Sequence, residues 1–109
     1  MNTVRILAVD DHEMTTLGYK YILEDSDFTD FNVKVEIAKS FEKGKSKIEL
    51  SKRAIPYDII LLDIQLFSPE SKDPRTGIDL GIVARNEVPN SKVVFMSSYS
   101  DNYRINNIF

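Results

Sequence analysis

The fold is decided by the stretch Tyr57-Asp58-Ile59-Ile60-Leu61-Leu62-Asp63. Residues 59–62 form an unbroken apolar run, which is typical of a strand covered on both faces, as in a parallel sheet flanked by helices. The run ends in a carboxylate, Asp63. Because ligands of open α/β sheets bind outside the carboxyl ends of the strands, Asp63 is a candidate functional residue. The alternative is that Asp63 only begins the next loop.

The rest of the chain alternates between strand and helix patterns. Mainly apolar segments predict strands at residues 4–9, 57–62 and 92–96, and an alternating pattern predicts a strand at residues 33–37. Helical periodicity predicts helices near residues 13–24, 41–53, 77–88 and 101–109. Strands that alternate with helices indicate a parallel sheet with helices on both faces. The predicted fold class is therefore α/β, a doubly wound parallel sheet.

Several local features refine this prediction. The first helix is expected to turn one apolar face inward, made of Met14, Leu17, Tyr21 and Ile22. Gly18 in the same helix predicts a close approach to a neighbouring backbone. Residues 33–37 alternate between apolar and polar, which suits a half-exposed edge strand, and Ser40 is a good N-cap for the next helix.

Composition excludes several classes of protein. The chain has 109 residues, enough for one domain, and a formal net charge of −3, which gives no electrostatic footprint for nucleic acid. It has no cysteine and one histidine, so it has neither a disulfide framework nor a thiolate or multi-histidine metal site. No apolar run reaches the length of a membrane span, and the N-terminus lacks a signal peptide pattern. We therefore expect a soluble cytoplasmic protein.

Acidic and hydroxyl side chains follow three of the predicted strands. Asp10 and Asp11 follow the first strand, Asp63 follows the third and Ser97 follows the fourth. Because parallel strands end at one edge of a sheet, these side chains should converge there. Two unit charges about 4 Å apart repel by roughly 4 kcal/mol at an effective dielectric near 20, so gathered carboxylates require a cation. Oxygen ligands select a hard ion, Mg²⁺ above all.

A magnesium site beside an aspartate suggests phosphoryl transfer. A carboxylate can attack phosphorus and form an aspartyl phosphate, and the Ser97 hydroxyl could donate a hydrogen bond to the phosphoryl oxygens. The alternative for Asp10 and Asp11 is a helix N-cap with a favourable dipole contact. A magnesium-dependent hydrolase would need a general acid soon after the nucleophile, and Gln65 there cannot ionise.

These residues resemble the receiver domain of bacterial two-component response regulators, over essentially the whole chain. The matching segments are residues 4–12 with Gly18, residues 59–64, residues 77–80 and residues 89–98. The opening Asp10-Asp11-His12 resembles the regulators that usually carry a helix-turn-helix output domain. The resemblance implies a flavodoxin-like sheet, with strand order 2-1-3-4 for the strands present here.

The resemblance also implies a role for each site residue. Asp63 would accept a phosphoryl group from a phosphohistidine on a histidine kinase or a phosphotransfer protein. Asp10, Asp11, Asp63 and the main-chain carbonyl of Gln65 would bind Mg²⁺. Ser97 would be the switch hydroxyl, which moves toward the phosphoryl group and biases a two-state equilibrium. Such a domain is a self-phosphorylating phosphoacceptor in a phosphorelay and not a turnover enzyme.

Two departures from the family pattern stand out. The loop Leu66 to Thr76 is long: the family usually has a proline soon after the phosphoacceptor, where Phe67 stands here, and a glycine shortly after it, whereas Gly77 comes much later. This loop could reshape kinase recognition or magnesium access, or be a surface insertion, which costs little in loop entropy.

The second departure concerns the C-terminus. The family continues with a fifth strand, which carries a lysine, and a fifth helix, so we expect residues 1–109 to form a single receiver domain that is C-terminally incomplete. The fourth strand would then be an exposed edge through which a homodimer could form. DNA would be bound only through an output domain absent from this chain. The alternative function is a phosphorylation-independent interaction or dimerisation module, and the sequence leaves open whether the chain is a natural short protein or a fragment.

Overall fold

The computed structural model describes residues 2–11, 13–25, 31–64 and 76–96. Four strands form one sheet, and every neighbouring pair is parallel. The order of the strands is β2-β1-β3-β4, which confirms the predicted order 2-1-3-4 and the predicted α/β class. The elements are β1 (Asn2–Val9), α1 (Glu13–Asp25), β2 (Phe31–Ala38), α2 (Phe41–Arg53), β3 (Ile59–Asp63), α3 (Gly77–Glu87) and β4 (Lys92–Met96).

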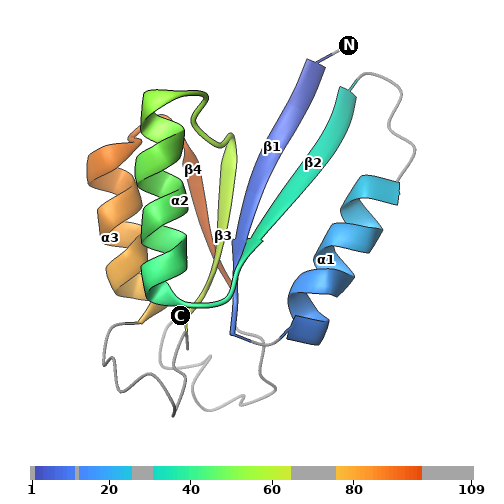
Figure 1. Cartoon of the computed structure of the whole chain (residues 1–109), viewed down its shortest axis with the longest axis horizontal. Coiled ribbons are helices and arrows are strands. Elements are labelled where there is room, and N and C mark those ends of the chain that lie inside the picture. The colour runs from blue at the N-terminus through green and yellow to red at the C-terminus, as the bar shows by residue number, and fades with distance from the viewer. Residues whose placement is uncertain (1, 12, 26–30, 65–75, 97–109) are drawn as a thin grey trace.

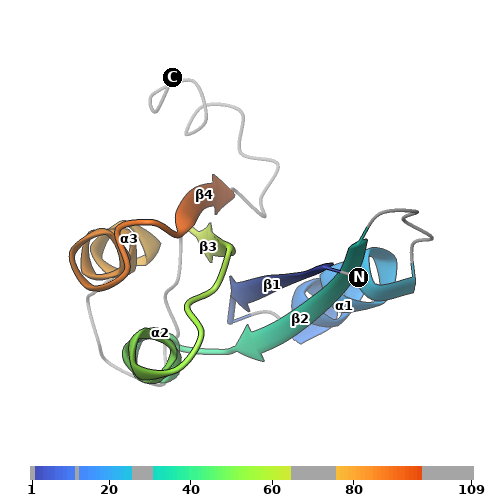
Figure 2. The same ribbon diagram turned by 90° about the horizontal axis from the view of Figure 1, so that it is seen from above.

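The three described helices cover opposite faces of the sheet. Helices α2 (green) and α3 (orange) lie together on one face, and α1 (blue) lies on the other, against β1 and β2 (Figures 1 and 2). Alternate residues of β3 therefore enter different cores. Ile60 and Leu62 pack under α2 and α3, while Ile59 and Leu61 pack on the α1 side. Coverage on both faces is why this strand is apolar without interruption, as the sequence predicted.

The larger core lies between the sheet and helices α2 and α3. Its buried members are Leu7, Val9, Ala38, Phe41, Ile48, Tyr57, Ile60, Leu62, Leu80, Ala84 and Val88. Helix α2 begins at the predicted N-cap: the Ser40 side chain accepts a hydrogen bond from the Lys43 N–H at 3.2 Å. Gly44 lies on the buried side of this helix, where an added Cβ would lie 2.7 Å from Leu80 Cδ2, so α2 and α3 pack closely at that point.

The inward face of α1 differs from the predicted one. Tyr21 and Ile22 are 64% and 69% exposed, and Tyr19 and Leu23 pack against the smaller core. The reason is that α1 lies against the edge strand β2 and bonds to its backbone. Lys20 Nζ donates to the Val35 carbonyl at 3.1 Å, and the Val35 N–H donates to Glu24 Oε2 at 2.8 Å. The side of α1 that meets the sheet therefore carries these polar contacts together with Tyr19 and Leu23.

The prediction for Gly18 is also wrong, because an added Cβ there would have no heavy atom within 4 Å apart from its own helix and its chain neighbours. The edge position of β2 is confirmed, and β4 is the other outer strand of the described sheet. No helix among the described residues is long and apolar enough to cross a membrane. The helix predicted at residues 101–109 lies outside the described residues.

The contact between α1 and β2 predicts a pH-dependent stability. The hydrogen bond from Val35, and next Lys20, lower the pKa of Glu24 from its usual 4.5, against the opposing effect of partial burial. A lowered pKa stabilises the fold above pH 4.5, and this contribution is lost as the pH falls through the lower pKa of the folded state. Glu24→Gln should therefore cost about 1 kcal/mol at pH 7 and less at pH 3.

Urea unfolding of both proteins at the two pH values measures this difference. Glu49→Gln, at an exposed position of α2, is the matched control and should change stability little at either pH. An equal cost of Glu24→Gln at pH 3 and pH 7 would contradict the assignment.

Burial in the core predicts that truncating Ile60 destabilises the fold far more than truncating Ile55. Ile60 is fully buried beneath α2 and α3, whereas Ile55 is 61% exposed. Ile60→Ala leaves a cavity that the core cannot fill, so it should cost about 2–5 kcal/mol in free energy of unfolding. Ile55→Ala should cost less than about 0.5 kcal/mol in the same urea titration. Similar losses for the two variants would contradict the described packing.

Candidate functional site

The parallel register of β1 and β3 sets the position of the acidic residues. Val9 lies opposite Leu62, so the next residues, Asp10 and Asp63, are level at the carboxyl edge of the sheet. Hydrogen bonds hold both ends in place. The Asp10 N–H donates to the Ala38 carbonyl at 3.1 Å, and the Ile64 N–H donates to the Met96 carbonyl at 2.9 Å. The edge is thereby connected across all four strands.

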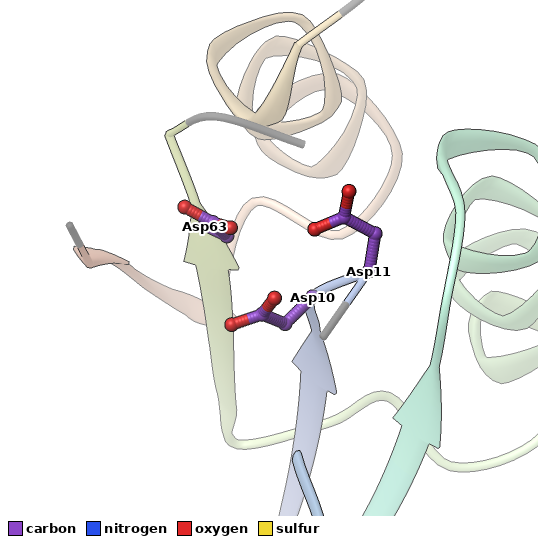
Figure 3. Close-up of side chains that lie close together, drawn as sticks. All are labelled: Asp10, Asp11 and Asp63. Carbon is purple, nitrogen blue, oxygen red and sulfur yellow. The ribbon is translucent and has the colours of Figure 1, made fainter. Parts of the chain in front are cut away.

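Three of the predicted site residues come together at this edge. Asp10, Asp11 and Asp63 each offer one carboxylate oxygen, and these atoms all lie within 4.8 Å of one another (Figure 3). We call these three residues the acidic cluster. Asp10 and Asp63 have no exposed surface, and Asp11 is partly buried. The other two predicted site residues, Gln65 and Ser97, lie outside the described residues.

The electrostatics of the acidic cluster favour a cation. Carboxylates this close repel one another, and burial reduces the screening by water. Asp10 Oδ2 and Asp11 Oδ1 are both buried from solvent. The negative potential extends to α1: burial first, and then the charges of Asp10 and Asp63, raise the pKa of the Tyr19 phenol. A bound cation would offset this concentration of negative charge.

The donor set fits a hard divalent ion. It consists of carboxylate oxygens, and the chain has no cysteine that could contribute a soft ligand. Oxygen-only sites of this kind suit Mg²⁺, which is usually held by one or two carboxylates together with water and phosphate oxygens. The residues present therefore agree with the metal that the sequence predicts.

Sequence reasoning did not find the contact between Gly77 and Asp63. A Cβ added at Gly77 would lie 1.8 Å from the Asp63 carbonyl oxygen, so the first turn of α3 rests directly on this main chain. The same turn carries a capping box. Thr76 accepts from the Ile78 N–H at 3.2 Å, and the Thr76 N–H donates to Asp79 Oδ2 at 2.7 Å. The glycine at the start of a helix was the only sequence signal of a close contact at position 77. Which residue it contacts depends on the tertiary fold.

Comparison with curated proteins identifies response regulators as relatives, although no family model matches the sequence. The chain is 28% identical over 103 residues to the response regulator protein VraR of Staphylococcus saprophyticus, a match that covers 94% of this chain and 43% of VraR. It is 28% identical over 97 residues to the transcriptional regulatory protein MctR of Rhizobium johnstonii, which covers 88% of this chain and 39% of MctR. The chain thus spans less than half the length of these relatives.

Solved structures with a similar fold also come from response regulators. A mutant of the response regulator MaeR bound to sulfate has a TM-score of 0.66 and 18% identity, covering 97% of this chain and 76% of that one. The response regulator domain of Thermotoga maritima CheB has a TM-score of 0.65 and 23% identity, covering 93% of this chain and 65% of that one. The fold is therefore that of a receiver domain, the class of domain found in response regulators of two-component signalling.

The acidic cluster predicts that replacing one of its carboxylates by a neutral amide stabilises the fold. Without divalent ions, Asp63→Asn should raise the free energy of unfolding by about 1 kcal/mol, because it removes one of three mutually repelling charges. Asp58→Asn is the control, since Asp58 accepts a hydrogen bond from the Arg5 N–H at 2.8 Å at the start of β3 and should lose stability when changed. Urea unfolding in a chelating buffer measures both, and a destabilised Asp63→Asn would argue against net repulsion.

Proposed function

We propose that this chain is a receiver domain that accepts a phosphoryl group on Asp63 from a phosphohistidine of a histidine kinase or a phosphotransfer protein. The observation that carries the proposal is the acidic cluster, whose carboxylate oxygens lie within 4.8 Å of one another at the carboxyl edge of a receiver fold. The similarity to VraR and MctR supports the same role in a phosphorelay.

Asp10, Asp11 and Asp63 would hold the magnesium ion, and the resemblance adds the main-chain carbonyl of Gln65. When bound, Mg²⁺ would neutralise negative charge on the transferring phosphoryl group. The described side chains of Asp10 and Asp11 approach Asp63 from β1, so they leave its carboxylate as the group opposite them on β3 (Figure 3).

In the proposed transfer, an oxygen of the Asp63 carboxylate attacks phosphorus. A phosphorus–oxygen bond forms, the phosphorus–nitrogen bond to the donor imidazole breaks, and the imidazole keeps the electron pair and takes up a proton. Ser97 would then act as the switch hydroxyl, by a hydrogen bond to the phosphoryl oxygens.

The wider role follows from the same proposal. The domain would act as a cytoplasmic phosphoacceptor without turnover of its own, and residues 1–109 would lie within one receiver domain. DNA would be bound only through an output domain of the helix-turn-helix type, which the resemblance implies. The relative MctR is named a transcriptional regulatory protein, which supports a role in transcription. The outer strand β4 would be the edge for pairing with a second copy.

Intact mass spectrometry after incubation with acetyl phosphate and Mg²⁺ tests the function. The wild-type protein should gain the mass of one phosphoryl group. Asp63→Asn should gain none, because the attacking carboxylate is gone, and chelation of Mg²⁺ should abolish the gain in the wild type. Asp58→Asn, which changes the aspartate directly before β3, at the end remote from Asp63, should gain as much as the wild type.

The absence of any gain in a folded wild-type sample that binds Mg²⁺ would contradict phosphoacceptor function. That outcome would support instead a phosphorylation-independent interaction module. A gain in both Asp63→Asn and the wild type would show that another residue is modified.

A further inference from the structure

Gly77 lies directly against the main chain of Asp63, a member of the acidic cluster. A Cβ built at this position would lie 1.8 Å from the Asp63 carbonyl oxygen, 2.7 Å from its carbonyl carbon and 3.3 Å from Ile64 Cα. Real Cβ atoms essentially never come this close to a heavy atom, and these contacts are with main chain and not with the end of a flexible side chain. Any side chain at position 77 must therefore displace either α3 or the Asp63 peptide.

Both partners in this contact are held firmly. On one side, the capping box of Thr76 and Asp79 fixes the first turn of α3, with the Thr76 N–H to Asp79 Oδ2 bond at 2.7 Å. On the other side, the Ile64 N–H is bonded to the Met96 carbonyl, which ties the residue after Asp63 to β4. An added methyl group would push against two anchored pieces of backbone, so the Asp63 main chain would have to rotate or shift.

We propose that Gly77 is a positioning residue for the phosphoacceptor: by letting α3 rest on the Asp63 carbonyl, it sets the direction in which the Asp63 carboxylate meets Asp10 and Asp11. This inference rests on the proposed function, since it assigns the position of Asp63 to a contact outside the acidic cluster. Gly77 acts through the Asp63 backbone and touches neither the metal nor the phosphoryl group.

Variants at two other positions distinguish a positioning role of Gly77 from a general effect on packing. Gly81 lies one turn further along the same helix, and an added Cβ there would meet the Phe95 ring at 2.6 Å. Phe95 is 46% exposed, so its side chain can move aside without disturbing the sheet. Ile48 in α2 is fully buried in the larger core, and its truncation would destabilise the fold without touching the Asp63 main chain.

Isothermal titration calorimetry with Mg²⁺ tests the proposal, at a temperature where circular dichroism shows each variant to be folded. Gly77→Ala should raise the Kd for Mg²⁺ about tenfold, as the loss of an orienting contact typically does. Gly81→Ala and Ile48→Ala should stay within about twofold of the wild type, although Ile48→Ala is destabilised. Amide NMR spectra of Gly77→Ala should also show displaced signals for Asp63 and Ile64 in the metal-free protein.

The possible results distinguish failure of the positioning role from failure of the proposed function. A folded Gly77→Ala with wild-type affinity and unshifted Asp63 and Ile64 amides would overturn the positioning role. A wild-type protein that does not bind Mg²⁺ would contradict the metal-dependent function, and the amide shifts alone would then decide the positioning role. If Gly77→Ala fails to fold, Thr76→Ala replaces it: loosening the first turn of α3 should raise the Kd several-fold, and an unchanged Kd would overturn the inference.

Discussion

The parallel pairing of β1 with β3 is the constraint on which the rest of the structure depends. With Val9 opposite Leu62, the residues that follow both strands emerge at one level, and the acidic cluster results. A slip of one residue would turn every side chain of a strand to the other face, so it would bury the wrong residues and separate the two aspartates. The register that packs the core is therefore the same register that assembles the site.

The buried carboxylates oppose the stability of the domain. Asp10 and Asp63 have no exposed surface, and buried charge is tolerated only where the surrounding structure holds it in place. Here the cores on both faces of the sheet provide that support, because the apolar residues of β1 and β3 that precede the aspartates are buried on either side. A site that is strained without its ligand is common where function depends on binding or reaction.

Sequence patterns predicted the strands and the acidic cluster, because these depend on local periodicity and on the shared edge of a parallel sheet. The order of the strands came only from the resemblance to receiver domains. The patterns failed for α1, where Lys20 and Glu24 bond to the β2 backbone and turn Tyr21 and Ile22 outward. They also could not find the contact of Gly77 with Asp63, because these residues lie far apart in the sequence and meet only in the folded chain. Polar contacts with backbone leave no periodic signal.

The contact between α3 and the end of β3 has a consequence for how this protein can change over evolution. Gly77 lies against Ile64, so the chain that joins them leaves and returns at nearly the same point, beside the acidic cluster. The sheet holds one end of this connection and the capping box holds the other. Each doubling of the length of a flexible connection costs only about 0.6 kcal/mol. New sequence can therefore be added next to Asp63 while the strands and the helix turn around it stay unchanged. The surface beside the acidic cluster can then evolve separately from the cluster itself.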